Sequence, residues 1–583
     1  MAAPKRKKSP ARGAAPAPET QRVASFSFAA LDALALGLIL LFALVLIHRN
    51  GFANGEELWP MPDAVEYAET AIDMDRGLGP VLHFAGDTYP TRYTIGYPLL
   101  LAVAYPLVGR RPELLCLATA LMALVAIAGL YLLTQWAFDR PSAIIAALLL
   151  ATSPYFIGLA TCVMSDVPSL ATTLLVALTF LYAEENGSPI AAALCGFIAG
   201  WAVTIRITSI VILIGMAAAL MLVKTRRIRI EQIVAFAVGF AVLPGVQASV
   251  NSHYFGSPFG NGYAFWRPDL YRSHFELFDA RYLFHPSVEK NIHGNLIAYL
   301  FALLGLDGIW GRLRIGMELR PLLHSRYSLY PFVAAIFAAL GLMFAEEERR
   351  PIALRAIYFG AGVFGALLLI YLFYFGQDVR FLMPGIFIVL ALAGYGVAAA
   401  NRAFTSGWIR AGVVVLDLVL AGAVALETFS RLATPGVDSK VVAEVHALKP
   451  RVANSVLVTD ISLPWLDLLE GDDHIELVGM DTLFAGEAIN EYHLHFLYEK
   501  RASGQPVSMP PVLLPNGQLD AVVAHQLADD DKRGRAVYLL VAMPMRTEWA
   551  GTLMGEFGEI DHSFVLETVQ RYPEIALYRM KPR

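Results

Sequence analysis

The sequence is poor in charged residues and in cysteine. Only 16% of the 583 residues are charged, whereas soluble proteins carry about 25%. So little charge excludes an ordinary soluble domain, and the 56% hydrophobic content indicates that lipid solvates much of the surface. The formal charge of -5 averages basic and acidic regions, so it identifies no partner, and nothing suggests nucleic acid. The cysteines are odd in number and lack the spacing of a metal site, which indicates packing residues: Cys116, Cys162 and Cys195.

Apolar runs follow a basic N-terminal tail. Residues 1–28 carry six Lys or Arg among Ala and Pro, a composition that predicts a disordered cytoplasmic tail. The run at 28–47 is longer than a signal-peptide core and no cleavage site follows it, so we expect an uncleaved first span. Ten further runs bring the expected total to about eleven transmembrane helices within 29–428: 114–138, 142–163, 167–183, 190–205, 207–223, 233–250, 329–344, 356–375, 381–400 and 409–426.

Basic residues in short loops predict how the chain is threaded. With the tail in the cytoplasm, three later basic clusters fall on the same side: Lys224 to Arg229, Arg349 to Arg355, and Arg402 with Arg410. Two further apolar runs are short, at 96–108 and 296–309. If either crossed the membrane, the basic clusters after it would lie on the outer side, so we expect neither to span the membrane. The large outward regions are then the loops 48–113 and 251–327 and the C-terminal region 429–583.

We interpret residues 429–583 as a small extracytoplasmic α/β domain. Short apolar or alternating runs predict strands at 455–459, 475–478, 537–543 and 575–578. His493 and His495 would share one strand face, but no third ligand is near, so a surface pair is favoured over a metal site. No motif in this domain specifies its chemistry.

Acidic residues are the first candidates for chemistry. Asp63 and Glu66 share one face of an expected helix, with Tyr67 beside them. Asp166 lies in a tight outward turn between two hydrophobic spans, where a charge is costly and indicates function. A structural alternative stays open for each. Acids also suit the positive end of a helix dipole, and Ser165 or Asp166 before a proline also suits a helix start.

Three arginines are threaded to the same outer face: Arg92, Arg206 and Arg380. Guanidinium groups bind phosphate through paired hydrogen bonds, which makes these side chains candidates for a phosphate site. The alternatives are lipid headgroups or, for Arg380, an ion pair with Asp378. Tyr97 lies in the same outward loop as Arg92, and with Tyr67 it is a candidate for binding or positioning an acceptor.

The order and side of these motifs resemble those of the GT-C membrane glycosyltransferases. This group includes protein O-mannosyltransferases and the aminoarabinose transferases of lipid A, and the resemblance covers roughly residues 30–400. The segment Pro62-Asp63-Ala64-Val65-Glu66-Tyr67 is similar to the family's first-loop acidic motif, whose aspartate is the proposed general base. The other similar segments are Arg92 to Leu101, Ser165-Asp166-Val167-Pro168, Arg206-Ile207-Thr208 and Phe255-Gly256-Ser257-Pro258.

The resemblance implies transfer of a sugar from a polyprenyl-phosphate carrier to a glycan, lipid or protein acceptor on the outer face. Asp63 would take the acceptor proton, Glu66 or Asp166 would orient it, and the three arginines would stabilise the departing phosphate. Many members place a second acid directly after the first, whereas this chain has Ala64 there, which leaves the carboxylate assignment open. The sequence indicates no metal site, and the help of a divalent metal also stays open. The expected location is a bacterial inner membrane.

Two other classes of function fit a chain with many spans. A transporter or lipid flippase usually shows related halves and broken helices near the membrane midplane, and no internal repeat is evident here. A membrane-anchored binding protein that used only its C-terminal domain would leave the first outward loop without a role. The candidate residues gather at one face rather than along a path, so an enzyme is favoured over both.

Overall fold

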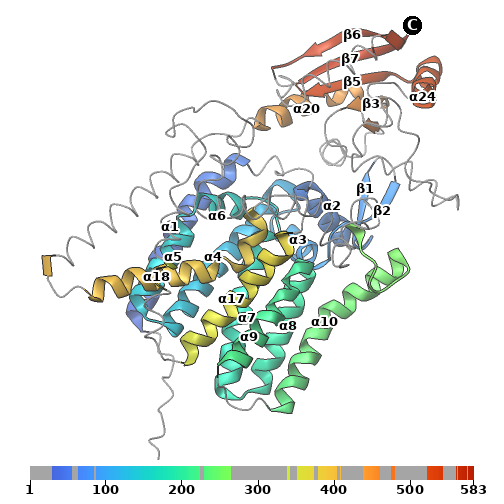
Figure 1. The fold of residues 1–583 in the computed structure, drawn as a ribbon. Helices are drawn as coiled ribbons and strands as arrows, with labels where there is room; N and C mark the ends of the chain where they lie inside the picture. Colours follow the sequence, from blue (N-terminus) through green and yellow to red (C-terminus); the bar gives the residue numbers. More distant parts are fainter. Residues whose placement is uncertain are drawn as a thin grey trace, which may run out of the picture.

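The structure is a computed structural model that combines a helical bundle with a small mixed sheet (Figure 1). It describes residues 29–54, 63–84, 87–223, 229–263, 351–372, 379–403, 438–459, 475–479, 521–542, 562–573 and 575–583, and a few single positions besides. Among these residues, five helices are long and apolar enough to cross a membrane, and five shorter apolar helices accompany them. The chain is a multi-pass membrane protein.

The helices of the bundle come from several stretches of the chain. They are α1 (Ala30–Asn54), α4 (Cys116–Ala137), α5 (Arg140–Ala151), α6 (Pro154–Ala160), α7 (Asp166–Asn186), α8 (Pro189–Ile205), α9 (Ile212–Leu222), α10 (Ile230–Phe255), α17 (Pro351–Leu372) and α18 (Phe387–Ala403). Short 3-10 helices are η2 (Pro112–Leu114), η3 (Ile207–Val211) before α9 and η6 (Val379–Gly385) before α18. The loop 48–113, which the sequence predicts to face outward and which we call the first outward loop, contains α2 (Asp63–Asp75), the hairpin of β1 (Val81–Phe84) and β2 (Asp87–Pro90), and α3 (Gly96–Leu107).

Most expected spans coincide with described helices, and one of them is broken. Within 142–163, α5 ends at Ala151 and α6 begins at Pro154, because the Ser153 hydroxyl caps the new helix by accepting the N–H of Phe156. The expected spans at 207–223 and 381–400 begin as the 3-10 helices η3 and η6. The span at 409–426 lies outside the described residues, and 329–344 is described at three positions only.

The short run at 96–108 forms α3, which has 12 residues. A helix of that length rises about 18 Å, well short of a hydrocarbon core about 30 Å thick. The prediction that this run does not cross therefore agrees with its observed length. The other short run, at 296–309, lies outside the described residues.

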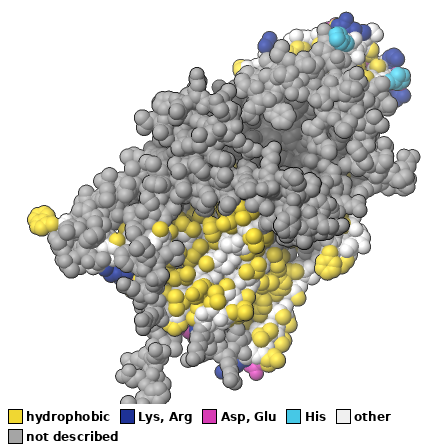
Figure 2. All heavy atoms as spheres, viewed as in Figure 1, with side chains coloured by type: hydrophobic (Ala, Val, Ile, Leu, Met, Phe, Trp, Pro, Cys, Tyr) yellow, Lys and Arg dark blue, Asp and Glu magenta, His cyan; other side chains and the backbone are white. Residues whose placement is uncertain are grey.

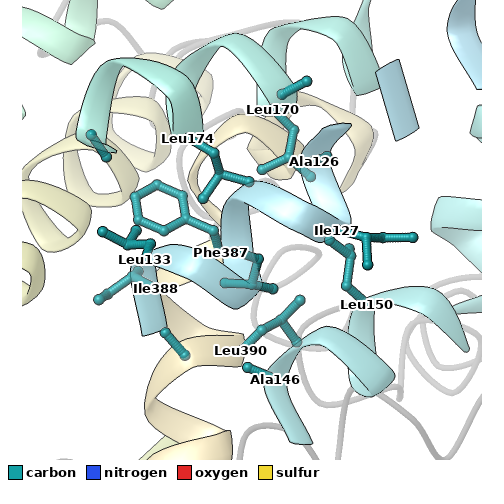
Figure 3. Packing of buried hydrophobic residues seen from close by; sticks show 14 of the residues in the cluster. Ala126, Ile127, Leu133, Ala146, Leu150, Leu170, Leu174, Phe387, Ile388 and Leu390 are labelled. Atoms are coloured by element: carbon teal, nitrogen blue, oxygen red, sulfur yellow. The ribbon is translucent and has the colours of Figure 1, made fainter. Parts of the chain in front are cut away.

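The core of the bundle lies where α4, α5, α7 and α18 meet (Figure 3). Leu133, Leu174 and Phe387, from three different helices, point toward one another and are fully or almost fully buried. The small side chains of Ala126 and Ala146 face the same region and let the helix backbones approach closely. This packing fixes the relative positions of the helix ends that carry the polar residues.

Hydrophobic side chains also cover the outside of the bundle (Figure 2). On α10 the exposed apolar residues include Ile233, Val234, Val238, Val242 and Val246. A helix that is apolar on its exposed face suits contact with lipid. Its other face approaches α8 closely, because a Cβ at Gly196 would overlap the carbonyl of Phe236. The helix ends at Phe255, and Gly256 closes it with a positive φ of 70°.

The C-terminal region forms a five-stranded sheet in the order β4-β3-β5-β7-β6. Its elements are α20 (Asp438–Val452), β3 (Val456–Thr459), β4 (Glu476–Gly479), α24 (Ala521–Lys532), β5 (Val537–Ala542), β6 (Phe564–Arg571) and β7 (Ile575–Pro582). Strand β3 is parallel to β4 and β5, whereas β7 is antiparallel to β5 and β6. Four of these strands were expected, and β6 was not, because its partly exposed edge position leaves a weak apolar pattern.

The sheet is buried on both faces. Val456 and Val458 face a cluster that includes Val523 and Leu527 of α24, while Leu457 between them belongs to a second cluster. This second cluster also contains residues of α20 and, from the first outward loop, residues of α2 and α3. One continuous apolar contact therefore joins the C-terminal domain to the first outward loop, as their proximity in Figure 1 also indicates.

Ion pairs gather at both ends of the bundle. We call the end at which α1 begins the Asp32 end and the end at which α1 finishes the Asp63 end. The pairs at the Asp32 end are Asp32 with Arg140, Asp139 with Arg402, and Glu184 with Arg355. Each of them joins two separate helices or a helix and a turn, so they tie the bundle together at this end.

Candidate active site

All six charged residues expected at the site lie at the Asp63 end, and they form three acid–arginine pairs. The pairs are Asp63 with Arg380, Glu66 with Arg92, and Asp166 with Arg206. The acids come from the starts of α2 and α7, and the arginines come from the loop before α3, the end of α8 and η6. The structure thus brings together residues as much as 317 positions apart in the chain.

The segment Thr91 to Tyr93 runs along the first turns of α2. The hydroxyls of Thr91 and Thr70 lie 3.0 Å apart, Arg92 Nη2 donates to Glu66 Oε1 at 2.7 Å, and Tyr93 donates to Asp63 Oδ1 at 2.6 Å. Positions 63, 66 and 70 share one helix face because they are three and four residues apart. Three successive side chains of the loop therefore hold one face of α2.

Asp63 is the most accessible of the three acids. Its side chain is 26% exposed, and Arg380 Nη2 donates to its Oδ2 at 3.3 Å, where Arg380 is 21% exposed. Asp63 is also the first residue of α2, so the helix-start interpretation describes its place as well. The expected alternative partner of Arg380, Asp378, lies outside the described residues.

The Glu66–Arg92 pair is buried, with side chains 1% and 5% exposed. An acceptor or a phosphate has little access to groups this deeply placed. The pair instead fixes the loop before α3 against α2, which favours a positioning role for both residues over the catalytic and phosphate-binding roles expected from the sequence.

Asp166 begins α7 and contacts Arg206 at the end of α8. Its carboxylate is fully buried, and Oδ2 has no hydrogen-bond partner among the described residues. The helix-start alternative also describes this place, because Ser165 is the N-cap residue and Asp166 the first residue of α7, although the Ser165 side chain makes no cap hydrogen bond. Ser165 Oγ instead accepts the hydroxyl hydrogen of Tyr67 at 3.0 Å.

Tyr67 connects the separate pairs. Its ring stacks on Tyr93 with centroids 4.1 Å apart and meets the edge of Tyr97 at 4.9 Å. Burial raises the pKa of Tyr67 well above its usual range, so the hydroxyl stays protonated and donates to Ser165. Tyr97 is fully buried and its hydroxyl lies 2.7 Å from that of Thr119, which suits positioning rather than contact with an acceptor.

Phe381 of η6 lies against two of the arginines. The guanidinium carbons of Arg206 and Arg380 lie 5.2 Å and 5.3 Å from the centre of its ring. Cations at this distance from an aromatic face are attracted to it. Tyr371 of α17 stacks on the same ring at 4.7 Å. Phe381 therefore places the two partly exposed arginines near each other.

The arrangement can be compared with known proteins. Residues 93–250 match the family model described as dolichyl-phosphate-mannose-protein mannosyltransferase. The crystal structure of ArnT from Cupriavidus metallidurans in the apo state is similar with a TM-score of 0.54 and 14% identity, covering 94% of this chain and 98% of that one. The chain has the fold of the GT-C membrane glycosyltransferases. The expected α-helical polytopic fold with a C-terminal α/β region is thereby confirmed.

Two further GT-C structures carry ligands. ArnT from Cupriavidus metallidurans bound to undecaprenyl phosphate gives a TM-score of 0.53 at 14% identity, with 94% of this chain and 98% of that chain covered. The archaeal oligosaccharyltransferase AglB from Archaeoglobus fulgidus, in complex with an inhibitory peptide and a dolichol-phosphate, gives 0.52 at 13% identity, with 94% and 74% covered. No curated protein sequence matches the chain.

Tyr93 and Phe381 belong to the site, and the sequence did not mark either of them. Tyr93 stands next to Arg92, so its place in the same motif was the available signal. Phe381 likewise follows Arg380 directly. Neither stands out, because aromatic residues near a membrane surface have an ordinary explanation in the interfacial belt.

Metal ligands are not gathered in the described part of the chain. No group of three or more His, Cys, Asp or Glu side chains there could hold a metal ion. His493 and His495 lie outside the described residues. The three cysteines are thiols that form no disulfide with one another, and Cys116 and Cys195 are buried.

Proposed function

We propose that the protein transfers a sugar from a polyprenyl-phosphate carrier to an acceptor hydroxyl or amine at the Asp63 end. The observation that carries this proposal is a partly exposed carboxylate, Asp63, that pairs with the partly exposed Arg380 on a GT-C fold, where Arg380 and Arg206 lie against the same ring of Phe381. A base and a cationic phosphate site at one end of an apolar bundle are what this reaction requires.

Asp63 is the proposed base. It takes the proton of the acceptor while the acceptor oxygen or nitrogen bonds to the anomeric carbon of the sugar. The bond from that carbon to the carrier's phosphate oxygen breaks in the same step, and the phosphate leaves with the electron pair. A single displacement of this kind inverts the anomeric centre and needs no covalent enzyme intermediate.

Arg380 and Arg206 are the proposed phosphate ligands. Both are partly exposed, and both contact the ring of Phe381. Charged hydrogen bonds to the leaving phosphate stabilise the negative charge that develops there. Asp166 is fully buried and accepts a hydrogen bond from Arg206, so its proposed role is to position this arginine.

The kind of donor and acceptor rests on the similar proteins. One of them is bound to undecaprenyl phosphate and another to a dolichol-phosphate and a peptide. We extend to this chain a polyprenyl-phosphate donor carrying a hexose or pentose, and a glycan, lipid or protein acceptor. We place the protein in a bacterial inner membrane, with the N-terminus in the cytoplasm and the C-terminal domain outside.

The first test compares membrane extracts made with and without the protein by mass spectrometry. The expected result is a glycan, lipid or protein that lacks one sugar when the protein is missing. A complete set of glycosylated products in its absence, together with a changed distribution of a lipid between the leaflets, would favour the flippase alternative.

The second test is Asp63→Asn in the purified protein. Loss of a general base lowers turnover by about 10²–10⁴-fold, while the variant should still bind the carrier lipid. Asp139→Asn, at the Asp32 end, is the matched control and should keep its turnover. Unchanged turnover in Asp63→Asn would remove Asp63 as the base.

A further inference from the structure

Arg380 is paired with the proposed base itself. Its Nη2 donates to Asp63 Oδ2, while Asp63 Oδ1 accepts from Tyr93. Both carboxylate oxygens of Asp63 therefore already accept a hydrogen bond, so an acceptor hydroxyl or amine meets Oδ2 only where Arg380 gives way. The proposed base and the proposed phosphate ligand therefore occupy each other.

The Asp63–Arg380 pair is also the easiest of the three to open. Its N···O distance is 3.3 Å, against 2.7 Å for Glu66–Arg92, and both of its side chains are partly exposed. The carboxylates of the other two pairs are buried, so separating those pairs would strand a charge away from water. A competing anion will thus take Arg380 before it takes Arg92.

We infer that the donor's phosphate takes Arg380 away from Asp63, so that the base becomes active only once the donor is bound. This inference rests on the proposed function. The guanidinium carbons of Arg206 and Arg380 lie 5.2 Å and 5.3 Å from the centre of the Phe381 ring, and the inference sets the phosphate between these two arginines. The donor's phosphodiester carries one negative charge and two free oxygens, as a carboxylate does, so it can replace Asp63 on the guanidinium, and Arg206 gives the phosphate a second cationic partner.

Tyr93 keeps Asp63 in place during the exchange. Its hydroxyl donates to Oδ1 at 2.6 Å, and burial, with the charges of Asp63 and Glu66 beside it, raises the pKa of Tyr93. The hydroxyl therefore remains a donor while Oδ2 loses its contact with Arg380. Oδ2 then accepts the acceptor proton, and the carbon–oxygen bond to the phosphate breaks as described above. Donor binding precedes activation of the acceptor in this scheme.

The exchange predicts an unusual result for carrier binding. The test measures the affinity of the purified full-length protein for undecaprenyl phosphate in detergent. Asp63→Asn removes the competitor for Arg380, so this variant should bind about two- to five-fold more tightly than the wild type, the range that corresponds to a partly exposed ion pair. The same variant should have lost sugar transfer. Tighter carrier binding with lost transfer is not expected of a residue that only supports the fold.

Two controls separate the exchange from a general charge effect. Glu66→Gln removes the same charge one turn along α2, but its partner Arg92 is buried, so carrier affinity should change less than about two-fold. In Arg380→Ala, the further change Asp63→Asn should have no effect on affinity, because the competition acts through Arg380. Asp63→Ser removes the charge in a second way, should one variant fold poorly.

The outcomes are distinguishable. Absence of undecaprenyl phosphate binding by the wild type would contradict the proposed function itself. If the wild type binds and Asp63→Asn binds equally or more weakly, the exchange is wrong while the proposed function stands. An equal gain in Asp63→Asn and Glu66→Gln would also overturn it, because charge alone would then explain the result.

Discussion

The two ends of the helical bundle use the same chemical pair in two different ways. Each end has three acid–arginine pairs that join separate helices or loops across the bundle. At the Asp63 end, Asp73–Arg76 and Asp75–Arg110 are two further pairs, and their arginines are largely exposed. At the Asp32 end the carboxylates also take backbone and capping hydrogen bonds: Asp32 accepts the N–H of Ala29 at 2.8 Å, and Asp139 accepts that of Ser142 at 2.9 Å as the cap of α5. These acids belong to helix starts and hold helices together.

At the Asp63 end the additional contacts come from tyrosines and an aromatic ring. Tyr93 donates to Asp63, Tyr67 donates to the residue before Asp166, and Phe381 faces two arginines. Side chains of this kind hold charged groups at a surface without tying them to the backbone. At the Asp32 end, Tyr131 likewise donates to Asp32 and Arg402 lies over the ring of Tyr395. The comparison therefore teaches that ion pairing alone does not identify a site, because pairs with aromatic support also hold helices together.

The largest expected effect on stability comes from breaking the buried ion pair at each end of the bundle. The two ends should lose similar amounts of stability. Arg355→Met leaves Glu184 without its ion-pair partner, and Arg92→Met does the same to Glu66. Each variant should lose about 3–5 kcal/mol of unfolding free energy, because an uncompensated charge stays buried. Thermal unfolding of the purified protein in detergent measures the loss.

Double variants separate stability from function in these pairs. Glu184→Leu with Arg355→Met should recover much of the stability, since apolar replacements remove the stranded charge. Glu66→Leu with Arg92→Met should do likewise and regain most of the sugar transfer. If the double variant at the Asp63 end is stable but transfers no sugar, then Glu66 or Arg92 takes part in the reaction and does more than position the loop.

The sequence predicts which residues gather at the Asp63 end but not how they pair. Apolar runs and the count of spans place Asp63, Asp166, Arg206 and Arg380 on one side, because each stands where a span begins or ends. Pairing depends on how helices pack, and Asp63 and Arg380 are separated by 317 residues. No local pattern carries that information.

Interruptions of helices and edge strands were the other limits of the sequence. The break between α5 and α6 depends on Ser153 and Pro154, which stand within one apolar run and so do not change its hydropathy. Among the described residues, strand β6 pairs with β7 alone and is partly exposed, so its polar residues hide the strand pattern. A local cap decides the first feature, and the position at the edge of the sheet decides the second.

The partly exposed pairs should separate the two ends by function. Arg380→Ala removes a proposed phosphate ligand and should lower turnover by about 10²–10³-fold, with carrier binding weakened more than acceptor binding. Arg402→Ala opens a comparably exposed pair at the Asp32 end and should leave turnover unchanged. Both variants should lose only about 0–1 kcal/mol of unfolding free energy. Equal turnover in the two variants would remove the functional difference between the ends.

The smallest expected effect comes from single tyrosine hydroxyls. Tyr67→Phe deletes the hydrogen bond to Ser165, and Tyr131→Phe deletes the one from Tyr131 to Asp32, 3.2 Å long. Tyr67→Phe should lose about 0.5–1.5 kcal/mol of unfolding free energy, and Tyr131→Phe about 1.5–3 kcal/mol because its partner is charged.

Only Tyr67→Phe should also lower turnover, since its hydroxyl joins α2 to the turn that carries Asp166. Because burial raises the pKa of Tyr67, this loss should be the same across neutral and mildly alkaline pH. A loss of turnover in Tyr131→Phe of equal size would mean that the hydroxyl acts through stability alone.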